Sequence, residues 1–171
     1  MLYNELMELM IKGYSILLDE EDYQKVNEVN WSPSFRGRKD PNKRYFVGNV
    51  KLSGRKQEFL HRFILNAPSY LMVDHINGDI LDNRKSNLRF ATRSQNHANT
   101  PKYKSNKSGY KGVWLQREKR KGKKAKDRWM ATATYQGRTI HLGSFKIPSE
   151  AAKAYDQFIL EKFGEFARTN F

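Results

Sequence analysis

An acidic and a basic side chain stand next to each other at Asp74-His75, directly after the short apolar run Leu71–Val73. Near pH 7 a neutral imidazole can take a proton from water. A carboxylate oxygen is a preferred ligand for a hard cation such as Mg²⁺, and the side-chain oxygen of Asn96 is another. Two protein ligands would leave positions open for a phosphate and a water. These residue types therefore suit hydrolysis of a phosphodiester assisted by one divalent cation.

The surrounding residues predict the elements that would bring this pair to Asn96. The run Leu71–Val73 is typical of a strand end, and the turn formers at 77–79 and 82–83 predict a loop. Leu88–Ala91 alternates apolar and polar side chains, which favours a returning strand. A short helix capped by Thr92 or Ser94 should follow and carry three polar side chains: Asn96, His97 and Asn99. Strand, loop, strand and helix would bring residues distant in sequence to one place.

The order Asp-His at 74–75, Asn-Leu-Arg at 87–89 and Gln-Asn-His-Ala-Asn at 95–99 resembles the HNH endonuclease motif. The resemblance covers roughly residues 61 to 99 and implies the ββα-metal fold, which holds one divalent cation. It makes His75 the general base and Asn87 the residue that braces the loop. It makes Asp74 and Asn96 the metal ligands, with Mg²⁺ or Mn²⁺ as the cofactor.

One position departs from the family pattern, because the last motif residue is often His. Here Asn96 matches best and His97 follows it, so either side chain could face the metal. A simpler interpretation makes Asp74-His75 a dipeptide in a turn-rich loop and Asn96 an ordinary cap. The complete series of motif residues in the right order favours the nuclease.

Several nearby basic residues are candidate accessory groups. His61 either assists the phosphate or metal site or is a hydrogen-bonded structural residue, and we favour the structural role. Three arginines would each either clamp a phosphate or lie at the surface as ordinary charges: Arg62, Arg89 and Arg93.

The composition points to a nucleic-acid partner. The chain has 171 residues, a net charge of +14 and a pI near 9.9, so an acidic polymer is the expected partner. A membrane surface is the alternative, but no basic amphipathic helix stands out. The absence of Cys excludes disulfides and any zinc site built on cysteines. With neither a transmembrane run nor a secretion signal, we expect a protein of the reducing cytoplasm of a bacterial host cell.

The first part of the chain should belong to the nuclease module. The apolar spacing from Met1 to Lys12 predicts a helix, Tyr14–Leu18 a strand, and the segment from Asp19 to Val29 a second helix. The acids at 19–22 could form a second metal site but suit a solvated helix start better. A hairpin should join 45–50 to 57–60. The basic loop at 36–44 either touches phosphates or is solvated.

The excess positive charge lies mostly after residue 100, which predicts two modules. We expect the nuclease module over residues 1–99, a basic linker over 100–107 and a second module over 108–171. The linker either lies along DNA or is a tether without fixed contacts.

The second module should be a three-stranded antiparallel sheet with one packed helix. Three successive strands are expected at 110–116, 128–135 and 138–145, with a very basic loop at 117–126 between the first two. A helix should begin near Ser149 and end at Gly164, with an apolar stripe toward the sheet. The fold class of the whole chain is therefore α+β, and the second face of this sheet would remain open for a DNA groove.

This module resembles the Apetala-two/ethylene-response-factor DNA-binding domain, on the sequences at 108–113, 128–131, 141–145 and 150–156. Trp114 and Trp129 could instead belong to the core. The target sequence does not carry over, because several reading positions differ. The resemblance implies ten DNA-facing residues: Lys111, Trp114, Gln116, Arg117, Arg128, Trp129, Thr132, Thr134, Arg138 and His141.

Together these features predict a site-specific, homing-type endonuclease of the phage or bacterial kind that acts, as a monomer, on double-stranded DNA. The resemblance implies a 5′-phosphate and a 3′-hydroxyl as products. A non-catalytic DNA-binding regulator is the alternative from another class, and a nuclease acting on RNA is a third. The narrow major groove of A-form RNA disfavours the third. The target site, and nicking as opposed to double-strand cutting, do not follow from the sequence.

Overall fold

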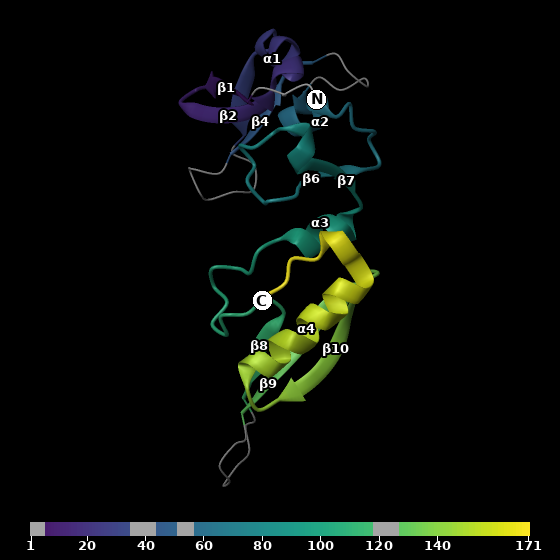
Figure 1. The fold of residues 1–171 in the computed structure, drawn as a ribbon. Helices are drawn as coiled ribbons and strands as arrows, with labels where there is room; N and C mark the ends of the chain where they lie inside the picture. Colours follow the sequence, from purple (N-terminus) through teal and green to yellow (C-terminus); the bar gives the residue numbers. More distant parts are fainter. Residues whose placement is uncertain (1–5, 35–43, 51–56, 118–126) are drawn as a thin grey trace. The chain divides into compact units, whose positions relative to one another are not determined.

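The computed structural model describes residues 6–34, 44–50, 57–117 and 127–171 (Figure 1). The chain divides into two compact units, residues 1–92 and residues 93–171. Small antiparallel sheets and helices occur in both units, so the expected α+β class is confirmed at that level. No helix in the described part of the chain is long and apolar enough to cross a membrane.

The described residues of the first unit form three small antiparallel sheets. They are β1 (Leu6–Ile11) with β2 (Tyr14–Asp19), β3 (Trp31–Ser34) with β4 (Tyr45–Gly48) and β5 (Glu58–Phe59), and β6 (Met72–His75) with β7 (Leu88–Ala91). Its helices are α1 (Glu20–Asn27), α2 (Leu60–Ile64) and the 3₁₀ turn η1 (Lys85–Asn87). The turn expected between β4 and β5, and most of the basic loop at 36–44, lie outside the described residues.

The helix expected at the start of the chain is wrong, because residues 6–11 form strand β1. Along β1 the exposure alternates: Leu6 and Met10 are exposed, whereas Ile11 is buried at the end of the strand. Lys12 and Gly13 both have positive φ, 49° and 86°, as the two-residue hairpin turn to β2 requires. The apolar spacing suits a helix as well as an edge strand, and this turn decides for the strand.

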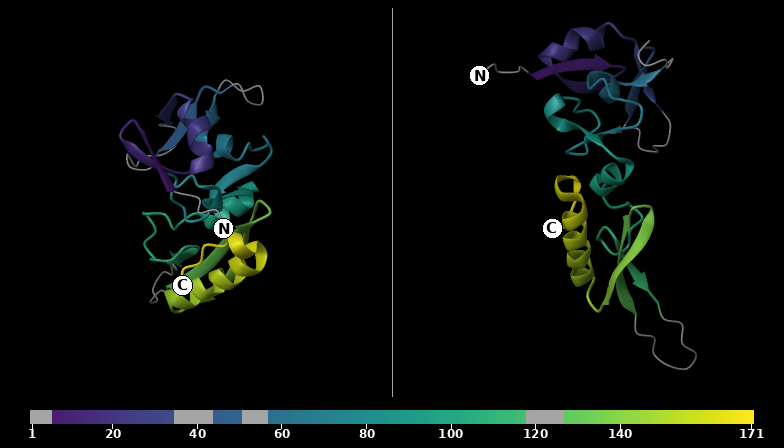
Figure 2. Two further views of the ribbon diagram at one scale, coloured as in Figure 1. Left: turned by 45° about the horizontal axis from the view of Figure 1, so that its top comes forward. Right: turned by 90° about the vertical axis from the view of Figure 1, so that its right-hand side faces the viewer.

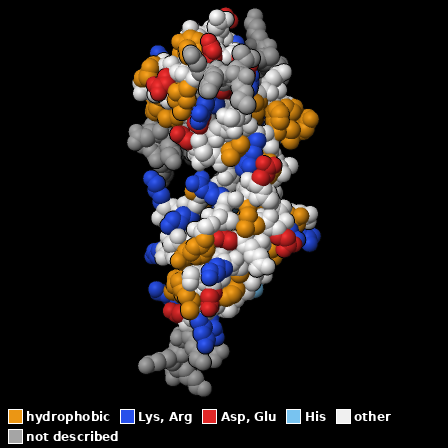
Figure 3. Space-filling model, in the orientation of Figure 1, with side chains coloured by type: hydrophobic (Ala, Val, Ile, Leu, Met, Phe, Trp, Pro, Cys, Tyr) orange, Lys and Arg blue, Asp and Glu red, His pale blue; other side chains and the backbone are white. Residues whose placement is uncertain are grey.

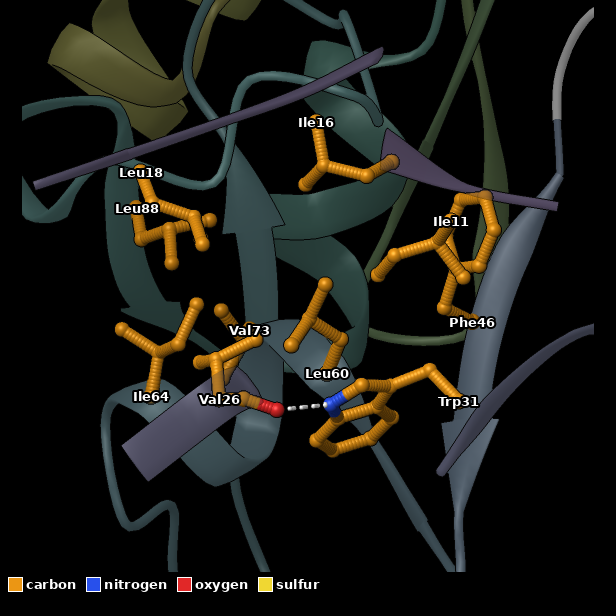
Figure 4. Close-up of a cluster of buried hydrophobic side chains, with 10 residues drawn as sticks. All are labelled: Ile11, Ile16, Leu18, Val26, Trp31, Phe46, Leu60, Ile64, Val73 and Leu88. Carbon is orange, nitrogen blue, oxygen red and sulfur yellow. Dashed lines mark hydrogen bonds between the residues drawn. The ribbon is translucent and has the colours of Figure 1, made fainter. Parts of the chain in front are cut away.

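One hydrophobic core joins the N-terminal segment to the hairpin that carries Asp74 and His75 (Figure 4). Val26 of α1 and Phe46 of β4 are almost completely buried, and Trp31 Nε1 donates a hydrogen bond of 2.8 Å to the Val26 carbonyl. Val73 of β6 and Leu88 of β7 belong to the same cluster. Burial of large apolar side chains from all these elements stabilises the hairpin. The hairpin alone, two strands of four residues, would be marginal.

The second unit is a three-stranded antiparallel sheet with helix α4 on one face (Figures 1 and 2). The strands are β8 (Val113–Gln116), β9 (Arg128–Tyr135) and β10 (Arg138–Phe145), in the order β10-β9-β8. Helix α4 spans Pro148–Phe163 and continues into η2 (Gly164–Phe166). Small residues at the contact, such as Ala131 of β9 and Ala151 of α4, are completely buried and let helix and sheet approach closely.

The short helix α3 (Arg93–Asn99) packs within the second unit. The Ala98 carbonyl accepts hydrogen bonds from Arg168 N, at 3.2 Å, and from Lys111 Nζ. Ala98 is buried in one cluster with Tyr155 and Ile159 of α4. These contacts satisfy the Ala98 carbonyl near the C-terminal end of α3, where carbonyl groups have no partner within the helix.

Gly112→Ala should destabilise the protein more than Gly137→Ala. Both glycines have φ near 74°, so an added Cβ costs each of them about 1–2 kcal/mol of backbone strain. At Gly112 that Cβ would also overlap the Tyr155 ring, whereas at Gly137 nothing lies within 4 Å. Crowding should cost about 1–3 kcal/mol more. Denaturant unfolding of the two variants measures the difference, and equal losses would contradict it.

Candidate active site and nucleic-acid interface

The hairpin of β6 and β7 places Asp74 and His75 at its end. Asp74 is opposite Arg89, and His75 is opposite Leu88. Alternation along β6 would send these neighbouring side chains to opposite faces, yet Asp74 is only 5% exposed and His75 only 4%. Both functional groups are therefore held inside the protein rather than on a free loop, as preorganisation of a site requires.

Asn87 closes the loop that leaves His75. Its Oδ1 accepts from Asn77 N at 3.0 Å, and its Nδ2 donates to the Asp82 carbonyl at 2.8 Å. Ile76 N donates to the Asn87 carbonyl at 2.8 Å. With one residue bonded to both sides of the loop, the loop ends are fixed. The role of Asn87 as the residue that braces the loop stays a prediction, which these hydrogen bonds support.

Burial lowers the pKa of the His75 imidazole below its ordinary value of 6.5. A hydrogen-bonding contact with Asn83 and the charge of Asp74 act in the opposite direction but are weaker causes. The distance from His75 Nε2 to Asn83 Oδ1 is 3.4 Å. A lowered pKa keeps the ring neutral near pH 7, which is the state that can accept a proton.

His61 of α2 lies beside His75. The two ring centroids are 5.2 Å apart, and the Tyr45 ring lies 5.1 Å from His61 and 6.2 Å from His75. His61 is 8% exposed and stacks on Phe59 at 5.6 Å. These rings pack around His75 and limit the orientations of its imidazole.

Arg89 and Arg62 have specific partners within the protein. Arg89 Nε and Nη2 lie 3.0 and 2.9 Å from Asp74 Oδ2. Arg62 pairs with Glu58 at 3.1 Å and donates to the carbonyls of Leu71, Ala67 and Pro68. Arg62 thus holds the turn before β6, which is neither of the roles considered for it from the sequence. Its carbonyl partners belong to a turn whose geometry cannot be predicted from the sequence.

Each of the two candidate metal ligands carries a side-chain oxygen. Asp74 offers a buried carboxylate, and its Oδ2 pairs with the Arg89 guanidinium. Asn96, on α3 in the second unit, offers an amide oxygen, and the neighbouring His97 is exposed. Oxygen donors of this kind suit Mg²⁺ or Mn²⁺. The chain contains no Cys for a cysteine-bound zinc.

The acidic residues at 19–22 form ion pairs with lysines. Lys85 Nζ lies 2.6 Å from Glu21 and 3.2 Å from Asp22, and Lys25 pairs with Asp22 as well. Lys85 N donates to Asp19 Oδ2 at 2.7 Å. Asp22 is only 1% exposed, so it is no solvated helix start. The acids link α1 to the 3₁₀ turn that precedes β7.

The open face of the second sheet brings together six of the ten residues expected to face DNA. The strand register places them opposite α4, because their neighbours Val113, Ala131 and Ala133 point into the core. The six are Trp114, Gln116, Arg128, Thr132, Thr134 and His141. Lys and Arg side chains are prominent on the visible surface of this unit (Figure 3).

The other four residues lie elsewhere. Trp129 packs with the core on the α4 side, which is the alternative considered for it from the sequence. Arg138 lies opposite Tyr135 in the strand register, so it is also on the α4 side of the sheet. Arg117 is exposed directly after β8, while the rest of the basic loop, 118–126, lies outside the described residues. Lys111 Nζ donates to the Ala98 carbonyl and lies 5.9 Å from the centroid of the Tyr155 ring.

Replacing Lys111 should remove a pH dependence of stability. Burial lowers the Lys111 pKa from 10.5 to about 8, Arg168 acts in the same direction, and Asp156 opposes. Between these two pH values the unfolded chain binds more protons than the folded one, so wild-type stability should rise with pH. Its free energy of unfolding, relative to that of Lys111→Met, should therefore increase from pH 8 to 10.5.

Denaturant titrations at several pH values measure this difference, with the exposed Lys153→Met on α4 as control for the loss of a lysine. A gap between wild type and Lys111→Met that stays constant across the window would contradict the prediction.

Comparison with known proteins identifies an HNH endonuclease segment in the chain. Residues 59–98 match the family model for HNH endonucleases. An uncharacterized HNH endonuclease of Acanthamoeba polyphaga mimivirus is 29% identical over 161 residues, 93% of this chain and 76% of that protein. Protein 3.8 of Escherichia phage T7 is 32% identical over 101 residues, 59% of this chain and 77% of that protein. No solved structure matches the chain.

The family match spans α2, β6, η1, β7 and nearly all of α3, and it includes Asp74, His75, Asn87 and Asn96. Residues 59–98 therefore form an HNH endonuclease domain, and the protein is a nuclease.

Proposed function

We propose that this nuclease is a site-specific, homing-type endonuclease that hydrolyses phosphodiesters of double-stranded DNA. His75 is the general base, and Asp74 with Asn96 holds one divalent cation, Mg²⁺ or Mn²⁺. The observation that carries the proposal is the buried, neutral-favouring His75 next to the buried Asp74, within the HNH match. The enzyme acts as a monomer on DNA in the cytoplasm of a bacterial host cell.

In this reaction, residues of the protein hold the base in position and move one proton, that of the attacking water. His75 takes the proton of the attacking water, and the surrounding rings of His61 and Tyr45 hold the imidazole in place. Asn87 keeps the loop closed. A bound cation would supply positive charge for the phosphate and the leaving oxygen.

The second unit would bind the DNA sequence. Its resemblance to Apetala-two domains, together with an open sheet face that carries Trp114, Arg128 and His141, supports insertion of the sheet into a major groove. The net charge of +14 supports contacts to phosphates on either side.

Wild-type protein incubated with supercoiled plasmid and Mg²⁺ should give relaxed or linear product, and EDTA should abolish it, because the cation completes the site. Agarose gels distinguish nicking from double-strand cutting. A library of random-sequence duplexes, tested also with Mn²⁺, covers the case of an absent target site. Intact duplex under all these conditions would refute the proposal, and preferential cleavage of structured RNA would assign another substrate.

A further inference from the structure

A cavity of about 150 Å³ lies within the second unit, lined by residues of α3, β9 and α4 and by the segment that follows α3. Its inner wall is apolar, because Ala98, Ile159 and Phe163 line it and are all buried in one cluster. Its lining also includes the exposed side chains of Lys102 and Tyr103. The cavity therefore combines an apolar interior with a basic, aromatic rim.

Lys111 lines the same cavity with most of its hydrogen-bonding capacity unused. An ammonium has three N–H donors, and Lys111 Nζ uses one of them, toward the Ala98 carbonyl. No carboxylate in the described part of the chain forms an ion pair with it. Burial lowers its pKa to about 8, which is the effect expected for a cation whose charge is poorly compensated. Two of its donors are therefore available to acceptor atoms of a ligand.

The C-terminal residues fix the backbone of Lys111. Lys111 N donates to Asn170 Oδ1 at 2.6 Å, and Asn170 Nδ2 donates back to the Lys111 carbonyl at 3.2 Å. Asn170 is itself held by Asp156 of α4, whose carboxylate accepts from Asn170 N at 2.9 Å. The ammonium therefore belongs to a residue whose position is set before any ligand binds, as preorganisation of a binding site requires.

The lining of the cavity favours a flat ring with acceptor atoms at its edge. A phosphate would bring charged oxygens against the apolar wall, which costs free energy. A pyrimidine base has apolar faces for that wall and edge oxygens that can accept from the Lys111 ammonium. An apolar cavity of about 150 Å³ can hold a ligand the size of benzene, which is one six-membered ring. A purine, with two fused rings, exceeds that size.

We propose that this cavity binds one extrahelical pyrimidine base of the DNA, with the ring against Ile159 and Phe163 and an edge oxygen on Lys111. The exposed Lys102 at the rim then attracts the phosphate of the same nucleotide. The inference rests on the proposed binding of DNA by this protein and deepens it, because it adds a base that is read outside the duplex. Extrusion of a base costs least where that base is already unpaired, so an unpaired pyrimidine is the best probe.

The first test measures the affinity of the full-length wild-type protein for three duplexes of otherwise identical sequence, by fluorescence anisotropy in EDTA. One duplex is fully paired, one carries a single unpaired thymine, and one carries a single unpaired adenine. The thymine duplex should bind about 10-fold more tightly than the paired one or better, as expected for a base held against apolar side chains. The adenine duplex should gain much less. Equal affinity for the thymine and adenine duplexes would overturn the proposal.

The second test repeats these measurements with variants of the cavity. Lys111→Met keeps the length of the side chain but has no donor, so it should lose most of the preference for the unpaired thymine. Ile159→Phe should lose it as well, because the larger ring occupies the cavity. Lys153→Met is the matched control, since this exposed lysine of α4 does not line the cavity. It should keep the preference of the wild type.

The outcomes separate the inference from the proposed function. A loss of affinity by Lys111→Met that is equal on all three duplexes would place Lys111 on the DNA backbone and overturn the base-binding role, while the nuclease stands. Because EDTA prevents metal-dependent cleavage, absence of cleavage by the wild type with Mg²⁺ would refute the proposed function and leave the base preference measurable. If neither cavity variant folds, the three wild-type affinities decide.

Discussion

Replacement of His75 by alanine should lower the rate of DNA cleavage by about 10²- to 10⁴-fold, the usual contribution of a general base. DNA affinity should remain close to that of the wild type, because a buried imidazole that acts on water contributes little to binding. Single-turnover cleavage and filter binding on the same duplex measure the two effects separately.

The control for His75→Ala is His75→Asn, which fills more of the buried space but offers no base of suitable pKa. Both variants should lose cleavage, whereas only the alanine variant leaves a cavity among the Tyr45 and His61 rings. Full cleavage by either variant would remove His75 from the mechanism.

The combined variant Trp114→Ala, Arg128→Ala and His141→Ala should bind its cognate site about 10²-fold more weakly or worse, since each lost base contact costs about 1–3 kcal/mol. The three side chains share the open face of the second sheet, so the core beneath it should be unaffected. Affinity measured against salt concentration should also show a smaller slope, because one charged contact is gone.

The matched control for this prediction is Lys153→Ala, an exposed lysine on α4, on the covered side of the sheet. It removes one positive charge without touching the open face. If the triple variant and this control bind equally well, the open face is not the DNA-reading surface.

Local patterns predicted the elements around the site well. The strands at 72–75 and 88–91 and the helix at 93–99 follow from short apolar runs and turn residues, which act between neighbours in sequence. The three strands and the helix of the second unit follow in the same way. The first strand was missed because apolar residues spaced along 6–11 fit a helix equally well, and only pairing with β2 distinguishes the two.

The contacts that hold the site depend on remote segments and could not be predicted. Asn83 belongs to a dipeptide that predicts only a turn, yet it is bonded to His75 and to the backbone of Leu17. Nothing in the sequence distinguishes Arg62 and Asp22 from other charged residues, yet the fold packs both against specific partners. Every residue has a backbone carbonyl, so the sequence does not show which carbonyl a polar side chain will bind. In the sequence, Asn83 stands out only as a neutral amide within a turn-rich segment.

The pairing of Leu17 with residues 81–83 has a consequence for the order of folding. The two segments are separated by most of the first unit, so this pairing closes a long loop and should form late. The amide hydrogen of Asn83 should then exchange with solvent only when the whole unit opens. During synthesis, the loop at 81–83 should therefore stay unformed until the hairpin of β1 and β2 has packed against it.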